Sequence, residues 1–112
     1  MIEITVKDYL ENALGVEVYA MLPPKHGETW VTVERTGGTD EFGKKTARLA
    51  IQSNAPTLYE AIRLNDRVIN EMLWGLIRLI TISRVELNST YNYTDTDDKQ
   101  PRYQAVFDIV HF

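Results

Sequence analysis

The chain has 112 residues, a usual length for one domain and long enough to bury a hydrophobic core. Hydrophobic residues make up 44% and charged residues 25%, a globular composition that excludes a disordered or collagen-like chain. Twelve Lys and Arg against sixteen Asp and Glu leave a net charge of −4, which argues against duplex nucleic acid as the main partner. No cysteine is present, so disulfides, thiol catalysis and cysteine zinc sites are excluded.

No stretch of the sequence predicts export or a membrane span. Charged residues interrupt the first 14 positions, where a signal peptide would need a continuous apolar segment. The longest apolar run, Met72 to Ile82, is broken by Gly75 and Arg78 and falls short of the roughly 20 residues that cross a bilayer. We therefore expect one soluble domain, residues 1–112, without a membrane partner.

The first half of the sequence predicts a helix and three strands. Apolar residues recur every three or four positions over residues 5–14, with a weak capping box at the start and Gly15 at the expected C-terminal cap. Alternating patterns then predict a strand over residues 16–20 and a hairpin formed by residues 29–36 and 46–53. The connection 37–45 is polar and looks too long for a two-residue turn, so we expect it to project as a loop.

The second half predicts a helix and two more strands. Thr57 and Glu60 form a capping box, and Gly75 is expected to end or weaken the helix. Its predicted apolar stripe is Leu58, Ala61, Ile62, Ile69, Met72 and Leu73. A strand over residues 84–93 and a final strand over residues 102–112 flank an acidic turn, residues 94–101. On the first of these strands we expect one face to carry Val85, Leu87, Tyr91 and Tyr93.

The predicted order is helix, three strands, helix, two strands. Hairpin-like links within each group of strands favour a mainly antiparallel five-strand sheet with both helices packed on it. The fold class is therefore α+β, with long projecting hairpin loops.

No residue pattern indicates catalysis. Glycine-rich phosphate loops and a Gly-x-Ser-x-Gly elbow are missing, and the two histidines, His26 and His111, are interpreted as a solvated loop residue and a strand-end residue. We expect no enzyme activity, cofactor or metal.

Two charged clusters have a functional and a plain interpretation. Asp95, Asp97 and Asp98 suggest the start of a calcium loop, but Lys99 and Gln100 occupy the next positions, where the sixth should be glycine. A solvated turn is the better interpretation.

The basic cluster Lys44, Lys45 and Arg48 could contact a phosphate. Because Asp40 and Glu41 lie beside it, a solvated hairpin end is favoured.

The aromatic residues of the strands suggest contacts with other proteins. Five of them fall near positions expected to be exposed or half-exposed, namely Trp30, Tyr91, Tyr93, Tyr103 and Phe107. A core position remains the better explanation for each one alone. Together with two long hairpins they indicate a surface for protein subunits, since interfaces favour aromatics and arginine.

Several segments resemble tail terminator proteins, also described as tail completion or tail-to-head joining proteins, of long-tailed phages of Gram-positive bacteria. The similar segments occur in the same order, and they are Ile2 to Leu10, Thr36 to Gly38, Leu49 to Ser53, Leu58 to Ala61 and Leu87 to Ile109. The resemblance implies a non-enzymatic subunit that forms a ring, expected to be a hexamer, on the last ring of the tail tube.

The resemblance also implies the place and partners of such a ring. It would stop tube growth, present the face that joins the head, and bind the tail tube protein and a head completion protein. It would lie at the head-proximal end of the virion tail after assembly in the host cytoplasm, with genomic DNA passing through it. A head completion protein or a small binding module remains an open alternative.

Residues expected at subunit contacts are Trp30, Lys44, Lys45, Asp95, Asp97, Arg102 and Tyr103. For Arg102 two interpretations stay open. It either bridges subunits through a carboxylate or pairs with Asp95, Asp97 or Asp98 in its own hairpin.

Overall fold

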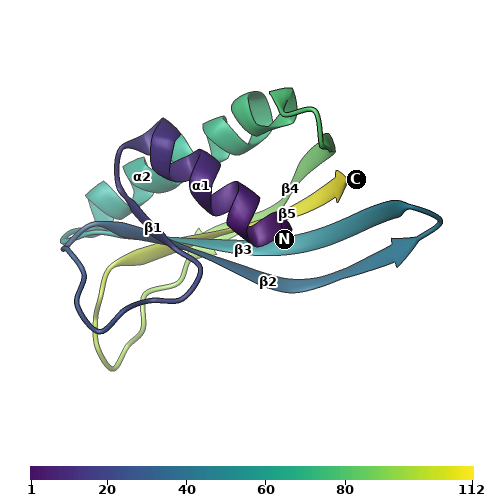
Figure 1. Ribbon diagram of the computed structural model, residues 1–112. Helices are drawn as coiled ribbons and strands as arrows, with labels where there is room; N and C mark the ends of the chain where they lie inside the picture. The colour runs from purple at the N-terminus through teal and green to yellow at the C-terminus, as the bar shows by residue number, and fades with distance from the viewer.

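A five-stranded sheet with two helices on one face forms the structure, a computed structural model that describes residues 1–112 (Figure 1). The elements in chain order are α1 (Ile2–Leu14), β1 (Glu17–Tyr19), β2 (Trp30–Glu41), β3 (Lys44–Asn54), α2 (Leu58–Asn70), the π-helical turn η1 (Glu71–Gly75), the 3-10 turn η2 (Leu76–Arg78), β4 (Ile82–Asn92) and β5 (Arg102–His111). The sheet order is β1-β2-β3-β5-β4. None of the helices combines the length and the hydrophobicity that a membrane span requires.

The predicted α+β class and element order are confirmed. All strand pairs are antiparallel except β1 with β2, which run parallel over three residues. The last strand, β5, lies between β3 and β4, so the chain ends inside the sheet rather than at its edge.

The core lies between the helices and the sheet. Both helices cover the same face of the sheet in Figure 1. The apolar stripe of α1 is Ile2, Val6, Leu10 and Leu14, and all four side chains are buried. Phe107 of β5 and Leu49 of β3 lie fully buried beneath the helices. Burying these large side chains supplies most of the driving force for folding.

Two predicted helix caps are present in the structure. Gly15 caps α1 in the left-handed conformation, and Thr57 caps α2 by accepting a hydrogen bond from the Glu60 backbone N–H at 3.2 Å, as predicted. The predicted start of α1 at Thr5 is wrong, because the helix begins at Ile2 and buries that side chain. Burial of the Ile2 side chain therefore decides where the helix begins, and the weak capping box at Thr5 does not.

The connection 37–45 is not the loop that the sequence predicted. Strands β2 and β3 stay paired as far as Glu41 and Lys44, and a two-residue turn, Phe42 and Gly43, closes the hairpin with φ angles of 54° and 77°. Gly38 permits this pairing, since a Cβ there would lie 2.1 Å from the Thr46 carbonyl oxygen. The projection itself is confirmed, because the hairpin extends beyond the rest of the sheet in Figure 1.

A bulge in β4 changes the predicted strand face. The register with β5 shifts between Leu87 and Ser89, so alternation is broken at that point. Leu87 pairs with the buried Phe107 on the helix side, whereas Tyr91 pairs with Gln104 on the opposite side. The prediction that Leu87 and Tyr91 share one face is therefore wrong.

Candidate subunit-contact surfaces

Two projecting ends and one uncovered sheet face are the candidate contact surfaces. The hairpin tip (residues 40–45) lies at one end of the paired strands β2 and β3, and the acidic loop (residues 94–101) lies at the other, where Asn54 pairs with Arg102. The molecule measures 43 × 25 × 25 Å, so the two ends point away from each other along an elongated body.

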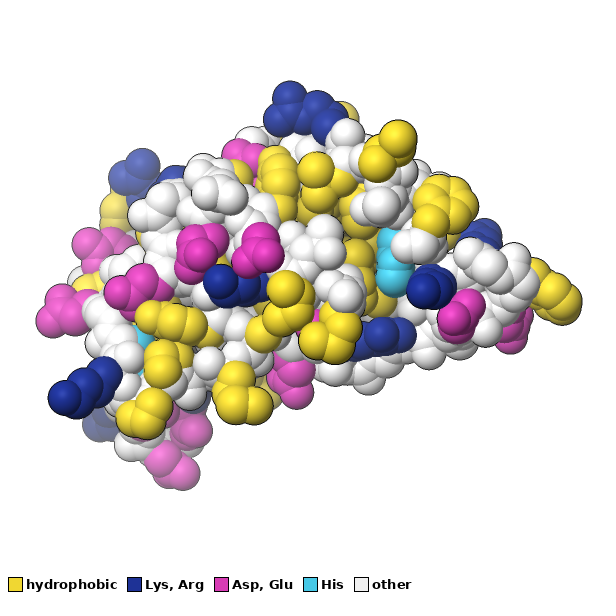
Figure 2. All heavy atoms as spheres, in the orientation of Figure 1, with side chains coloured by type: hydrophobic (Ala, Val, Ile, Leu, Met, Phe, Trp, Pro, Cys, Tyr) yellow, Lys and Arg dark blue, Asp and Glu magenta, His cyan; other side chains and the backbone are white.

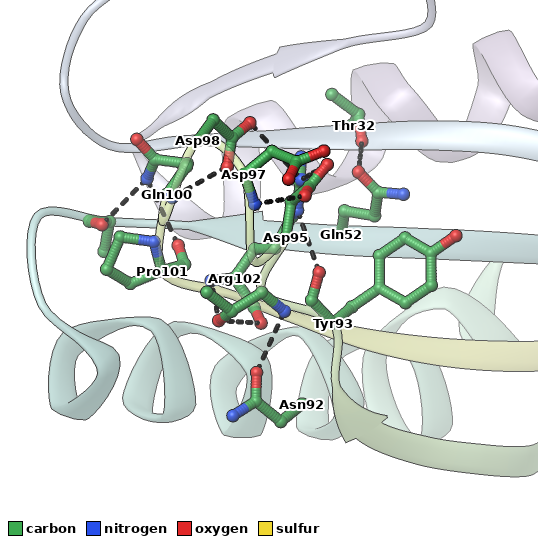
Figure 3. Close-up of polar contacts among 12 residues, drawn as sticks. Thr32, Gln52, Asn92, Tyr93, Asp95, Asp97, Asp98, Gln100, Pro101 and Arg102 are labelled. Carbon is green, nitrogen blue, oxygen red and sulfur yellow. Dashed lines mark hydrogen bonds and ion pairs between the residues drawn. The ribbon is translucent and has the colours of Figure 1, made fainter.

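Hydrogen bonds between side chains and backbone N–H groups hold the acidic loop (Figure 3). One carboxylate oxygen of Asp95 accepts from the Asp97 N–H at 2.8 Å, and one of Asp98 accepts from the Gln100 N–H at 2.9 Å. The Gln100 side-chain amide donates to the Ala55 carbonyl at 3.0 Å, which ties the loop to the start of α2. Hydrogen bonds between an Asp side chain and the backbone N–H two residues later are typical of Asx-turns. The carboxylate of Asp97 forms none of these hydrogen bonds, and Asp97 is exposed.

Arg102 pairs within its own hairpin. Its guanidinium lies 3.6 Å from Asp95 and 3.5 Å from Asp98, its Nε donates to the Tyr93 carbonyl at 2.9 Å, and its Cζ lies 5.9 Å from the centre of the Tyr93 ring. The local interpretation of Arg102 is thus present in the single chain. A second role at a subunit contact stays a prediction.

The hairpin tip carries charges of both signs around one aromatic residue. Lys44 lies opposite Glu41 and Lys45 opposite Asp40, yet none of these four side chains forms an ion pair. Phe42 stands at the turn and is fully exposed. Figure 2 shows a hydrophobic side chain at the outer end of the hairpin, with acidic and basic side chains close behind it.

The aromatic residues do not lie together on one surface. Trp30 is only 7% exposed, and its ring centre lies 4.1 Å from that of His26 in the preceding loop. The expectation that Trp30 and Phe107 lie near exposed positions is wrong, since Phe107 belongs to the core. Of the five strand aromatics, Tyr103 is half-buried, and Tyr91 and Tyr93 are exposed.

A row of polar side chains that the sequence did not predict crosses the uncovered face of the sheet. It takes one residue from each of four neighbouring strands: Thr32, Gln52, Gln104 and Tyr91. Thr32 donates to Gln52 at 3.5 Å, Gln52 to Gln104 at 3.0 Å, and Gln104 to the Tyr91 hydroxyl at 2.6 Å. Figure 3 shows the first pair facing each other from adjacent strands.

A second polar row lies on the same face. Arg48 donates to Asp108 at 2.8 Å, and the Asn88 amide donates to the same carboxylate at 3.0 Å. The Arg48 hydrogen bond, aided by Asn88, holds the pKa of Asp108 below its ordinary value. Asn88 reaches Asp108 from the bulge in β4, a feature that no alternation pattern reveals. Two hydrogen-bonded polar rows therefore run across the uncovered face, with Ala50 and Val106 between them.

No three acidic or histidine side chains are grouped where they could hold a metal ion. The surfaces consist of hydrogen-bonded turns, ion pairs and polar rows.

Comparison with known proteins gives a likeness in fold. No protein-family model and no curated protein sequence matches the chain. Among solved structures, the chain is similar to one chain of the virion of a native gene transfer agent (GTA) particle, with a TM-score of 0.66 and 13% sequence identity. The alignment covers 98% of this chain and 89% of the other. The chain is therefore similar in fold, over 98% of its length, to a chain of a GTA virion.

Proposed function

We propose that the chain is a structural subunit of a phage or phage-like particle, and that copies of it form a ring on the end of the tail tube. The ring stops tube growth and provides the face that joins the head. The observation that carries this proposal is the likeness of fold, over 98% of the chain, to a chain of a GTA virion. The order of the tail-terminator-like sequence segments supports the same role.

The shape of the subunit supports assembly into a ring. A closed ring needs two different, complementary surfaces on each subunit, placed so that one copy contacts the next head to tail. The hairpin tip and the end that carries the acidic loop are two such surfaces, at opposite ends of the paired strands. The uncovered sheet face could remain in water inside a channel, because its polar groups are already hydrogen-bonded.

Growth of the tail tube in the presence of the purified chain tests the role. The cognate tail tube protein is allowed to polymerise with and without the chain, and tube lengths and ends are measured by electron microscopy. Shorter tubes that carry a ring of this protein at one end are expected. Rings that bind the head connector and leave tube length unchanged would instead indicate a head completion protein and would contradict the proposal.

A further inference from the structure

The turn of the β2–β3 hairpin places Phe42 in a backbone conformation that is unfavourable for a bulky residue. Both turn residues have positive φ, 54° at Phe42 and 77° at Gly43, which is the geometry that two-residue hairpins build from Asn-Gly or Asp-Gly. A bulky side chain at the first position is disfavoured there. Phe42 is also 105% exposed, so it gains nothing from packing in the single chain. Neither folding nor solubility explains this residue, and its strained position is a sign of function.

A groove at the other end of the subunit has the size to take this side chain. It lies between the N-terminal half of α2 and the segment before it, with a volume of about 410 Å³, and Val16, Ala55 and Leu64 form its apolar lining. The groove is open to solvent and lined by polar as well as apolar side chains, and its volume exceeds the roughly 150 Å³ of a cavity that holds benzene, so there is room for a phenyl ring. Tyr59 stands on its rim, 68% exposed.

The charges around the groove complement those of the hairpin tip. Arg63 and Arg67 line the groove together with Glu60. Arg63 lies over the Tyr59 ring and, like Glu60, forms no ion pair in its own chain. Arg63 can meet the carboxylates of the tip, residues 40–41, while Glu60 meets the lysines, residues 44–45. Arg67 already donates to the Leu14 carbonyl at 2.7 Å and adds positive charge beside Arg63. Unpaired charges of both signs at both ends favour this pairing in one register and oppose others.

We infer that the hairpin tip of one copy inserts Phe42 into the α2 groove of the next copy in the ring. The inference rests on the proposed ring and names the contact that closes it. The hairpin turn and the N-terminal end of α2, which lines the groove, lie at opposite ends of the paired strands (Figure 1). The contact is therefore heterologous and passes from copy to copy. Phe42 is the apolar anchor, and the charges around it set the register.

Phe42→Asn separates assembly from folding. Asparagine suits the positive φ of the turn, so the variant should melt at or above the temperature of the parent, measured on dilute monomer. Loss of the anchor should raise the concentration for half-assembly by about tenfold or more, measured by sedimentation velocity. Phe42→Leu keeps an apolar side chain and should restore assembly. The matched control is Ile80→Asn, at a site that is 96% exposed and outside both surfaces.

Cross-linking identifies the partner surface. Because the chain has no cysteine, the pair Lys44→Cys and Tyr59→Cys places one thiol beside the tip and one on the rim of the groove. Mild oxidation should give a ladder of covalent oligomers that ends at the size of the ring. Each single variant should give dimers at most, and Lys44→Cys with Ile80→Cys should give no ladder.

The outcomes separate this inference from the proposed function. A parent chain that stays monomeric with tail tubes and without them contradicts the ring itself. Rings that persist unchanged in Phe42→Asn, or an equal loss in Ile80→Asn, overturn the role of Phe42 and leave the ring in place. Loss of assembly in Phe42→Asn without a cross-linked ladder overturns the groove as its receptor.

Discussion

The contact between α1 and the turn η1 depends on the absence of one methyl group. The hydroxyl of Tyr9 donates to the Glu71 carboxylate at 2.8 Å. A Cβ at Gly75 would lie 1.8 Å from that hydroxyl oxygen and 2.7 Å from the Glu71 carboxylate. Burial, together with the hydrogen bond to Glu71, raises the pKa of Tyr9, so the phenol stays protonated and can donate. Gly75→Ala must therefore displace the Tyr9 ring, break this hydrogen bond, or do both.

The size of the effect follows from three contributions. Overpacking costs about 1–3 kcal/mol. The lost hydrogen bond costs about 1 kcal/mol, and the better helix propensity of alanine offsets it by about 1 kcal/mol. We expect Gly75→Ala to lower the free energy of unfolding by about 1–3 kcal/mol. In Tyr9→Phe, where the clashing oxygen is gone, the same substitution should cost less than about 1 kcal/mol.

A double-mutant cycle measures this coupling. The parent, Tyr9→Phe, Gly75→Ala and the double variant are unfolded in urea at one low protein concentration, so that assembly does not alter the apparent stability. The expected interaction free energy is about 1–3 kcal/mol, with the double variant more stable than the two single effects predict. Additive effects, within about 0.5 kcal/mol, would refute the packing of Tyr9 against Gly75.

Three further substitutions test the core, the uncovered face and the acidic loop. Phe107→Ala should cost about 3–5 kcal/mol in urea unfolding, because the ring is fully buried, and a loss below about 1 kcal/mol would place it outside the core. The lowered pKa of Asp108 means that its ion pair with Arg48 stabilises the fold above the ordinary pKa near 3.8 and is lost as the pH falls through the lower, folded value. Asp108→Asn should therefore lose about 0.2–1 kcal/mol near neutral pH and nothing in strong acid, and an equal loss at both would contradict this role. Arg102→Ala should lower the free energy of unfolding by no more than about 1 kcal/mol, and rings with unchanged mass and salt tolerance would leave the pairing with Asp95 and Asp98 as its whole role.

Local signals predicted what depends on a few neighbouring residues. The cap of α2 follows from Thr57 and Glu60, and the end of α1 follows from Gly15, because each needs only one turn of chain. The order of helices and strands followed in the same way from hydrophobic periodicity. The prediction that α1 starts at Thr5 failed because the start of the helix depends on burial of Ile2, and this burial depends on tertiary packing.

The errors come from pairings between distant residues. The hairpin continues to Glu41 and Lys44, Gly38 lets its strands approach, and neither the register nor this close approach is visible in the sequence. The bulge beside Asn88 turns Tyr91 to the uncovered face, where it meets Gln104. No pattern in the sequence predicts the polar rows, since their members come from four different strands.

The central claim is that copies of this chain close into a ring. Native mass spectrometry of the purified full chain, over a range of concentrations and with negative-stain microscopy of the same sample, tests it most directly. The account predicts one discrete oligomer, six chains by the resemblance to tail terminators, seen as a ring with an open centre. A monomer at every concentration, or a two-fold dimer that never forms a ring, would contradict it.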